Sequence, residues 1–152
     1  MALTMEQSVK RFNKEIKREL KERLIQNAAR FQKTIAMRVL RGVIKLTPVD
    51  TGRARANWQV GVDKRPVSIV PPPIDIADDA NINEKTLAED TFKKGSNELE
   101  VLTVLRQVVW IVNNVPYASE LEHGSSQQNP EGMVRKTMAR VARFSKETGK
   151  SL

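Results

Sequence analysis

The chain of 152 residues has no cysteine, a single histidine (His123) and few aromatic residues, which make up 5% of the sequence. The absence of cysteine excludes a disulfide framework, a zinc ribbon and a thiol nucleophile. One histidine leaves little for a histidine-based metal site or a Ser-His-Asp triad. Hydrophobic residues make up 39% of the chain, so we expect a thin, mainly aliphatic core.

Long apolar runs are also missing. No run of 18 apolar residues occurs, and we therefore expect no helix that spans a membrane. Residues 1–10 lack the apolar segment of a secretory signal, so we expect none. The length predicts one domain over residues 1–152.

Basic residues outnumber acidic ones by 26 to 18, but they are unevenly distributed. Residues 1–46 carry a net charge of +8, residues 47–129 a net charge of −4, and residues 130–152 a net charge of +4. Basic ends around an acidic middle are compatible with nucleic-acid binding, with self-association, or with a basic helix face that is simply solvated.

The first third of the chain predicts one long helix. Thr4 and Gln7 have the spacing of a capping box, and Pro48 disfavours helix at Thr47. Lys, Arg and Glu fill most of the face opposite the apolar residues, with Glu6–Lys10 and Glu19–Arg23 as i,i+4 pairs. Apolar residues recur between these limits at steps of three or four, at Val9, Phe12, Ile16, Leu20, Leu24, Ala28, Phe31, Ile35, Val39 and Val43.

Such a helix would be about 63 Å long at about 1.5 Å per residue, which exceeds the diameter of a small domain. Either it breaks near Asn27 to form a hairpin, or residues 1–30 protrude and pack on a neighbouring subunit. We favour the protruding form.

The middle of the chain predicts a strand followed by an extended arm. Residues 57–62 alternate in polarity, which places Trp58, Val60 and Val62 on one face of a strand. Residues 63–83 contain four prolines and four aspartates and predict an extended acidic surface arm, either in contact with a partner or disordered.

Further elements follow the arm. We expect a helix over 83–94 that Gly95 stops, a second helix from Ser96 through Leu105, a buried central strand over 108–112, and a short helix over 117–122. A C-terminal helix opens at Gly132 or Met133, and residues 146–152 fray. Its apolar side is expected to be Val134, Met138, Val141 and Ala142, and its basic side Arg135, Lys136, Arg140 and Arg143. The predicted class is α+β, in which the two terminal helices pack on a small, mostly antiparallel sheet.

Four residues, Asp50, Glu120, Glu122 and His123, carry side chains that suggest catalysis, but they lack the spacing of a zinc protease. No phosphate-binding glycine motif occurs, so we expect no enzyme activity, cofactor or metal. Four large aromatic residues lie in helical or strand patterns, and we expect these four to pack in the core rather than to stack on nucleic-acid bases. They are Phe12, Phe31, Trp58 and Trp110.

Two separated runs together resemble the signature of a neck and tail-completion family of tailed bacteriophages. The first is Thr47-Pro-Val-Asp-Thr-Gly-Arg-Ala-Arg-Ala-Asn-Trp58, and the second is Asn113-Asn-Val-Pro-Tyr-Ala118 followed by Leu121-Glu122 and residues up to Val134. The resemblance covers roughly residues 35–62 and 96–144, and leaves the N-terminal half-helix and the arm outside. The motif positions, taken as structural or interface residues, are Pro48, Asp50, Thr51, Gly52, Arg53, Asn57, Trp58, Asn113, Asn114, Pro116, Tyr117, Leu121, Glu122, Gly124, Ser126, Pro130, Gly132 and Met133.

The resemblance implies a structural virion protein at the head–tail junction, assembled in the cytoplasm of the host bacterium. It implies a homo-oligomeric ring, often a hexamer, that completes the tail tube and joins it to the head connector or stopper, with double-stranded DNA passing through the channel. The alternatives are a head-side adaptor ring and a DNA-binding protein without sequence specificity.

Physical roles for some motif residues follow as hypotheses. We expect Asp50 and Thr51 to cap the turn that enters Arg53, and Arg53 to pair with the carboxylate of Glu122. We expect Asn113 and Asn114 to satisfy backbone groups at the end of the strand. Pro116 and Gly124 are expected to set turns.

Overall fold

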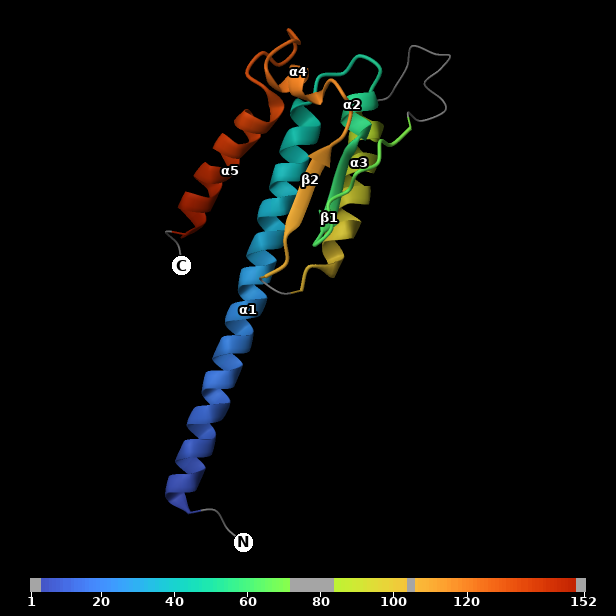
Figure 1. Ribbon diagram of the computed structural model, residues 1–152. Coiled ribbons are helices and arrows are strands. Elements are labelled where there is room, and N and C mark those ends of the chain that lie inside the picture. Colours follow the sequence, from blue (N-terminus) through green and yellow to red (C-terminus); the bar gives the residue numbers. More distant parts are fainter. Residues whose placement is uncertain (1–3, 72–83, 104–105, 150–152) are drawn as a thin grey trace.

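The computed structural model describes residues 4–71, 84–103 and 106–149. The predicted α+β class is confirmed: a long N-terminal helix and a C-terminal helix accompany a small antiparallel sheet (Figure 1). The elements are α1 (Met5–Leu46), α2 (Arg53–Ala56), β1 (Trp58–Val62), α3 (Glu84–Glu98), a 3₁₀ turn (Leu99–Val101), β2 (Val109–Asn113), α4 (Ala118–Glu122) and α5 (Met133–Gly149).

Helix α1 is a single helix of 42 residues, so the break near Asn27 does not occur. The capping box is present: Thr4 Oγ1 accepts a hydrogen bond from the Gln7 backbone N–H, and Gln7 Oε1 accepts one from Thr4 N–H. The predicted Glu6–Lys10 and Glu19–Arg23 ion pairs each form at 2.7 Å. In Figure 1 the N-terminal half of α1 extends far beyond the rest of the molecule, as predicted.

The core lies between the C-terminal half of α1, the sheet and α3. Strands β1 and β2 pair antiparallel, with Trp58 opposite Asn113 and Val62 opposite Val109. Trp58 and Val60 are buried against α1 and Val62 packs beside them, which confirms the predicted inward face. The buried core residues are Ala36, Leu40, Val43, Ile44, Trp58, Val60, Leu99 and Met133.

Strand β2 is not the buried central strand that the sequence predicts. The sheet of the described chain has two strands, so β2 has a neighbouring strand along one edge only. Val109 and Ile111 pack on the core from one face of β2, and the other face is open. Val108 before the strand is 53% exposed and Trp110 within it 39% exposed. A β-branched run does not distinguish burial on one face from burial on two, which explains the error.

Helix α3 continues through Gly95, where the sequence predicts a stop. A Cβ atom at Gly95 would lie 2.7 Å from Leu40 Cδ2 and 2.9 Å from Val60 Cγ2. The glycine therefore allows α3 to approach α1 and β1 closely, and it does not end the helix. The second helix predicted from Ser96 is wrong up to Thr103, since only the 3₁₀ turn follows, and residues 104–105 lie outside the described chain.

The inward face of α5 also differs from the prediction. Met133, Thr137 and Val141 are buried, while Val134 and Met138 are 36% and 50% exposed. The buried stripe contains a threonine, which the apolar pattern did not include. Residues 146–149 continue the helix instead of fraying, and residues 150–152 lie outside the described chain.

Residues 63–71 of the predicted arm carry no helix or strand. The side chain of Asn57 fixes their far end, because its Oδ1 accepts from Val70 N–H at 2.7 Å and its Nδ2 donates to the Val70 carbonyl at 3.0 Å. The prolines and aspartates of residues 72–83 lie outside the described residues. Among the helices that the structure describes, none has an 18-residue stretch apolar enough to cross a bilayer.

Candidate functional site

The two motif runs, far apart in sequence, meet at the C-terminal end of α1. Residues from both line one cavity of about 220 Å³ between the turn 48–54 and the segment 117–128. Half-buried Tyr117, Leu121 and Ser126 line its wall, whereas the motif residues Pro116 and Pro130 are exposed and do not line it. The lining residues are Pro48, Val49, Asp50, Thr51, Gly52, Arg53, Ala54, Tyr117, Leu121, Ser126 and Gln128.

Thr47 connects the first motif run to the core. Its hydroxyl accepts a hydrogen bond from Trp58 Nε1 at 2.7 Å and donates to the Val43 carbonyl at 2.6 Å. The same oxygen lies 3.3 Å from the sulfur of Met133. Thr47, Trp58 and Met133 are all buried, so this contact ties the end of α1 to β1 and to the start of α5.

Two amides that the sequence analysis missed hold the turn after α1. Gln128 donates to the Val49 carbonyl and accepts from the Val49 N–H, both at 2.9 Å. Asn129 Nδ2 donates to the Leu46 carbonyl at 2.9 Å, and Asn129 is 5% exposed. Their only signal in the sequence is a pair of amides directly before Pro130, between the predicted helix over 117–122 and the C-terminal helix.

The expected cap by Asp50 and Thr51 is wrong. Both residues are exposed, and the N-cap of α2 is Gly52, for which no side-chain cap bond forms. Gly52 has φ 71°, a left-handed conformation that glycine adopts without steric cost. Glycine is therefore required here by backbone geometry.

Asn113 and Asn114 satisfy backbone groups as predicted. Asn113 Nδ2 donates to the Ala54 carbonyl at 2.7 Å, which joins the end of β2 to helix α2. Asn114 Nδ2 donates to the carbonyls of Pro66 and Ser68 at 3.2 and 2.9 Å. The two asparagines thus connect the second motif run to the first run and to the base of the arm.

The predicted Arg53–Glu122 ion pair is wrong, because Glu122 lies at the N-terminus of α5. Its carboxylate accepts from the N–H groups of Val134 and Arg135 at 2.7 and 3.0 Å, and Arg135 Nε is 3.4 Å away. Burial, the largest single effect, raises the pKa of Glu122, but the backbone N–H groups and the Arg135 side chain together lower it. Glu122 therefore caps α5 as an anion.

Two motif glycines frame this capping carboxylate. Gly124 has φ 89° and confirms the predicted turn there, while Gly132 has φ 80°. A Cβ atom at Gly132 would clash with the Glu122 carbonyl oxygen, and a Cβ atom at Gly124 would lie 2.6 Å from the Pro130 carbonyl oxygen, which is also a clash. The backbone crossing between α4 and α5 is therefore too tight for side chains.

The four residues with catalytic potential do not form one set. Asp50 and Glu120 are exposed, Glu122 caps α5, and His123 Nδ1 lies 2.7 Å from the Ser119 carbonyl. Within residues 4–71, 84–103 and 106–149, no group of three His, Asp or Glu side chains could hold a metal ion.

The expectation that the large aromatic residues pack in the core holds only for Trp58. Phe12 is 62% exposed, Phe31 37% and Trp110 39%, whereas Trp58 is 6% exposed. The sequence pattern alone cannot distinguish a stripe that is buried within the chain from one that another molecule covers.

The N-terminal half of α1 carries an uncovered apolar surface. Every residue from 4 to 27 is exposed. Five apolar side chains form what we call the stripe: Val9, Phe12, Ile16, Leu20 and Leu24. At about 100° per residue, the stripe lies roughly 150° around the helix from the core face that contains Ala36 and Leu40, so it does not extend the core.

A second uncovered apolar surface lies between α1 and α5. This apolar groove has a volume of about 420 Å³, and it contains exposed Met138, which the sequence placed in the core. The residues that line it are Ala28, Phe31, Gln32, Ile35, Met138, Val141, Ala142 and Ser145.

These features define a small α+β protein whose motif residues fix turns and chain crossings, and whose uncovered apolar surfaces lie elsewhere. Residues 8–124 match the family described as "Bacteriophage HK97-gp10, putative tail-component". The chain belongs to this HK97-gp10-like family of phage tail components, which confirms the predicted phage resemblance. No curated protein and no solved structure matches the chain.

The matched range corrects the extent of the resemblance. It begins at residue 8 and spans residues 63–83. It therefore includes most of the N-terminal half-helix and the arm, both of which lay outside the resemblance described from the sequence. It ends at residue 124, before the motif positions Ser126, Pro130, Gly132 and Met133. Membership of the family therefore extends to the stripe itself.

Proposed function

We propose that this chain is a structural subunit of the phage head–tail junction, where copies of it form a ring that completes the tail and joins it to the head connector or stopper. Membership of a family of tail components supports a place in the virion. In this proposal the protein is not an enzyme, needs no cofactor or metal, and is assembled into particles in the host cytoplasm.

The observation that carries the proposal is the uncovered N-terminal half of α1. Residues 5–27 span about 34 Å of helix at about 1.5 Å per residue. The five apolar side chains of the stripe along them are exposed by 38% to 71%. Contiguous apolar surface of this kind marks a protein-interaction site in soluble proteins, and a subunit of a larger assembly supplies the cover.

Two different uncovered surfaces support the proposed ring. A closed ring needs a head-to-tail contact, in which one patch on each copy binds a different patch on the next. We assign the stripe of one copy to the apolar groove of the next copy. The groove offers Phe31, Ile35 and Met138 to the aliphatic side chains of the stripe.

Basic residues on the protruding helix have a secondary role in this proposal. The stripe is flanked by lysines and arginines, and four ion pairs with glutamates on the same helix neutralise some of them. The remainder faces acidic partners at the junction or DNA that transits the channel without sequence readout.

Self-assembly tests the proposal. Purified protein is compared with Phe12→Gln/Leu20→Gln/Leu24→Gln by light scattering after gel filtration and by electron microscopy, alone and with tail tubes. We expect rings from the wild-type chain and monomers from the variant. Arg11→Gln/Arg18→Gln, on the opposite face of the same helix, is the matched control and should assemble. A wild-type chain that stays monomeric with tail tubes present would contradict the proposal.

Stoichiometry separates the alternatives. A six-fold ring supports the tail side of the junction, and a twelve-fold ring supports a head-side adaptor. A DNA-binding protein that acts alone would shift duplex DNA with a steep salt dependence and would not need the stripe.

A further inference from the structure

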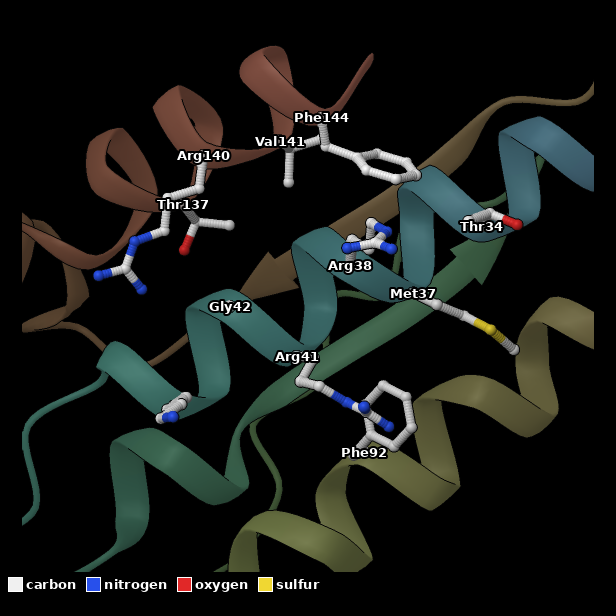
Figure 2. A pocket seen from close by; sticks show the side chains of 11 residues that line it. Thr34, Met37, Arg38, Arg41, Gly42, Phe92, Thr137, Arg140, Val141 and Phe144 are labelled. Atoms are coloured by element: carbon white, nitrogen blue, oxygen red, sulfur yellow. The ribbon is translucent and has the colours of Figure 1, made fainter. Parts of the chain in front are cut away.

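A basic groove crosses α1 on the side away from the core, between α5 and α3 (Figure 2). Its volume is about 450 Å³. Three of its cations, Arg38, Arg41 and Lys45, come from α1, and Arg140 comes from α5. An adjoining cavity of about 630 Å³ shares Arg41 and Lys45, adds two more cations and contains a single carboxylate; those three residues are Arg55, Lys85 and Glu89.

Two of the guanidinium groups are held in place by aromatic rings. Arg38 lies 3.5 Å over the ring of Phe144, and Arg41 lies 4.4 Å over the ring of Phe92. Figure 2 shows both pairs at the groove. Stacking leaves the N–H edges of a guanidinium free for a planar anion such as a carboxylate. It also covers one face of each ring, which disfavours stacking on nucleic-acid bases.

The groove is not neutralised by the described part of the chain. None of its four cations has a carboxylate within ion-pair distance there, and Glu131, near Arg140, is paired with Lys136 at 2.7 Å. The hydroxyl of Thr137, which also lines the groove, is 1% exposed and has no hydrogen-bond partner among the described residues. Unneutralised cations beside an unsatisfied buried hydroxyl favour an anionic ligand.

We propose that the basic groove of one copy binds the acidic segment Ile74–Asp79 of a second copy. The segment reads Ile-Asp-Ile-Ala-Asp-Asp and lies outside the described residues, between Pro71 and Glu84. Its three carboxylates match the cations of the groove, and its two isoleucines match the apolar lining that Met37 and Val141 provide. The inference rests on the proposed function, since it requires copies of the chain to associate.

A second copy, rather than the same chain, fits the direction of the surfaces. At about 100° per residue, Arg38, Arg41 and Lys45 lie within roughly 40° of the mean direction in which the stripe points from α1. A neighbour that covers the stripe therefore extends over the groove. Three consecutive prolines, Pro71–Pro73, form a stiff sequence, which disfavours a tight turn of the segment back onto the groove of its own chain.

Single cysteines provide the direct test, because the natural chain has none. Full-length Asp78→Cys and Lys45→Cys, carrying different tags, are mixed, assembled and oxidised. We expect a disulfide-linked pair that contains one chain of each kind. Ser125→Cys, an exposed position at the motif turn, replaces Lys45→Cys as the matched control and should give no such pair. The double variant Lys45→Cys/Asp78→Cys is oxidised in parallel. A disulfide that forms only within single chains of this double variant, and never between the two single variants, would overturn the proposal.

Charge reversal gives an independent readout. Arg41→Glu/Lys45→Glu and Asp75→Lys/Asp78→Lys/Asp79→Lys should each associate at least about tenfold more weakly than the wild-type chain. An equimolar mixture of the two variants should restore association, because each arm then meets a groove of opposite charge on a neighbour. If the mixture fails while a chain with all five substitutions recovers, contact within one chain is favoured and the proposal is wrong.

The outcomes separate this inference from the proposed function. If the wild-type chain does not assemble, the proposed function fails first. If it assembles and both arm and groove variants assemble equally well, only the inference fails. Binding of a 20-base-pair duplex that Arg41→Glu/Lys45→Glu abolishes, while the arm variant assembles normally, would assign the groove to DNA and overturn the inference.

Discussion

The two halves of helix α1 have the same kind of sequence but different surroundings. In the C-terminal half, Leu40, Val43 and Ile44 are at most 2% exposed, because the sheet, α3 and α5 cover them. In the N-terminal half, Leu20 and Leu24 are 63% and 71% exposed. Leucines of one helix thus differ only in what lies beside them. Packing within the chain buries the C-terminal half of α1 against the sheet, α3 and α5, which together we call the body, and leaves the N-terminal half exposed.

The apolar pattern of α1 also differs in direction between its N-terminal and C-terminal halves. Its steps average about 3.8 residues against the 3.6 of an α-helix, so the pattern rotates around α1 by roughly 18° per step. The stripe and the core face therefore point in different directions. A helix that packed on one core alone would keep one apolar face, and the rotation instead leaves a second apolar face that the body does not cover, as the proposed assembly requires.

Leu40→Ala against Leu20→Ala tests this comparison most strongly. Leu40 is fully buried, and its truncation should reduce the free energy of unfolding by about 3–4 kcal/mol. Leu20→Ala should change it by less than about 0.5 kcal/mol in the monomer, whereas in the proposed ring it should weaken association. Urea unfolding at low protein concentration measures both. A large loss for Leu20→Ala would mean that the N-terminal half folds back on the body in solution.

Thr47→Val tests the buried hydrogen bond that connects the end of α1 to Trp58. The substitution removes the acceptor of the buried Trp58 N–H, and an unpaired buried donor should cost about 2 kcal/mol. Unfolding followed by tryptophan fluorescence measures the change. Thr34→Val is the matched control on the same helix, since Thr34 is exposed and its hydroxyl contacts only its own helix at the Arg30 carbonyl. Equal effects of the two substitutions would contradict the role of Thr47.

Gly95→Ala tests how closely the body packs on α1. Helix propensity alone favours alanine by about 1 kcal/mol, but the new methyl group would lie 2.7 Å from Leu40 Cδ2. We expect a net destabilisation of about 1–2 kcal/mol from overpacking, measured by thermal unfolding. Lys94→Ala, next to it on the exposed side of α3, should be close to neutral. A stabilised Gly95→Ala would show that the contact is loose.

Glu122→Gln tests the cap of α5, the helix that covers the body half of α1. The pKa of Glu122 is lowered from 4.5 on folding, so its ionised form stabilises the fold above pH 4.5, and this contribution is lost as the pH falls through the folded pKa. Glu122→Gln should therefore cost about 1 kcal/mol at pH 7 and little at pH values below the folded pKa. Glu120→Gln, which is exposed on α4, is the control. A cost that does not depend on pH would contradict the capping role.

Local rules were sufficient for the fold wherever one element decided its own structure. The capping box, the stop before Pro48, the alternation of β1 and the turn at Gly124 all follow from residues close in sequence. The errors arise where packing decides. Gly95 permits contact with Leu40 instead of ending α3, and Thr137 belongs to the buried face of α5.

The motif cluster shows the same limit. The sequence indicated which positions matter and that Asn113 and Asn114 serve the backbone. It could not indicate that Glu122 pairs with Arg135 rather than Arg53, because that choice depends on where α5 begins relative to α4. Gln128 and Asn129 were missed for the same reason: their partners, Val49 and Leu46, are some 80 residues away in the chain.

Thr4→Ala makes the smallest change and separates the two halves of α1 most sharply. The capping box of Thr4 and Gln7 fixes the exposed end of the helix, and its loss should cost about 1 kcal/mol of local helix stability. Backbone amides in the first turns should then exchange hydrogen about fivefold faster. The midpoint of global unfolding should not move, because residues 4–27 make no contribution to the core. Ser8→Ala, without a capping role, is the control. If assembly through the stripe is correct, the faster exchange should disappear in the ring, since a neighbour then holds the first turns in place of the cap.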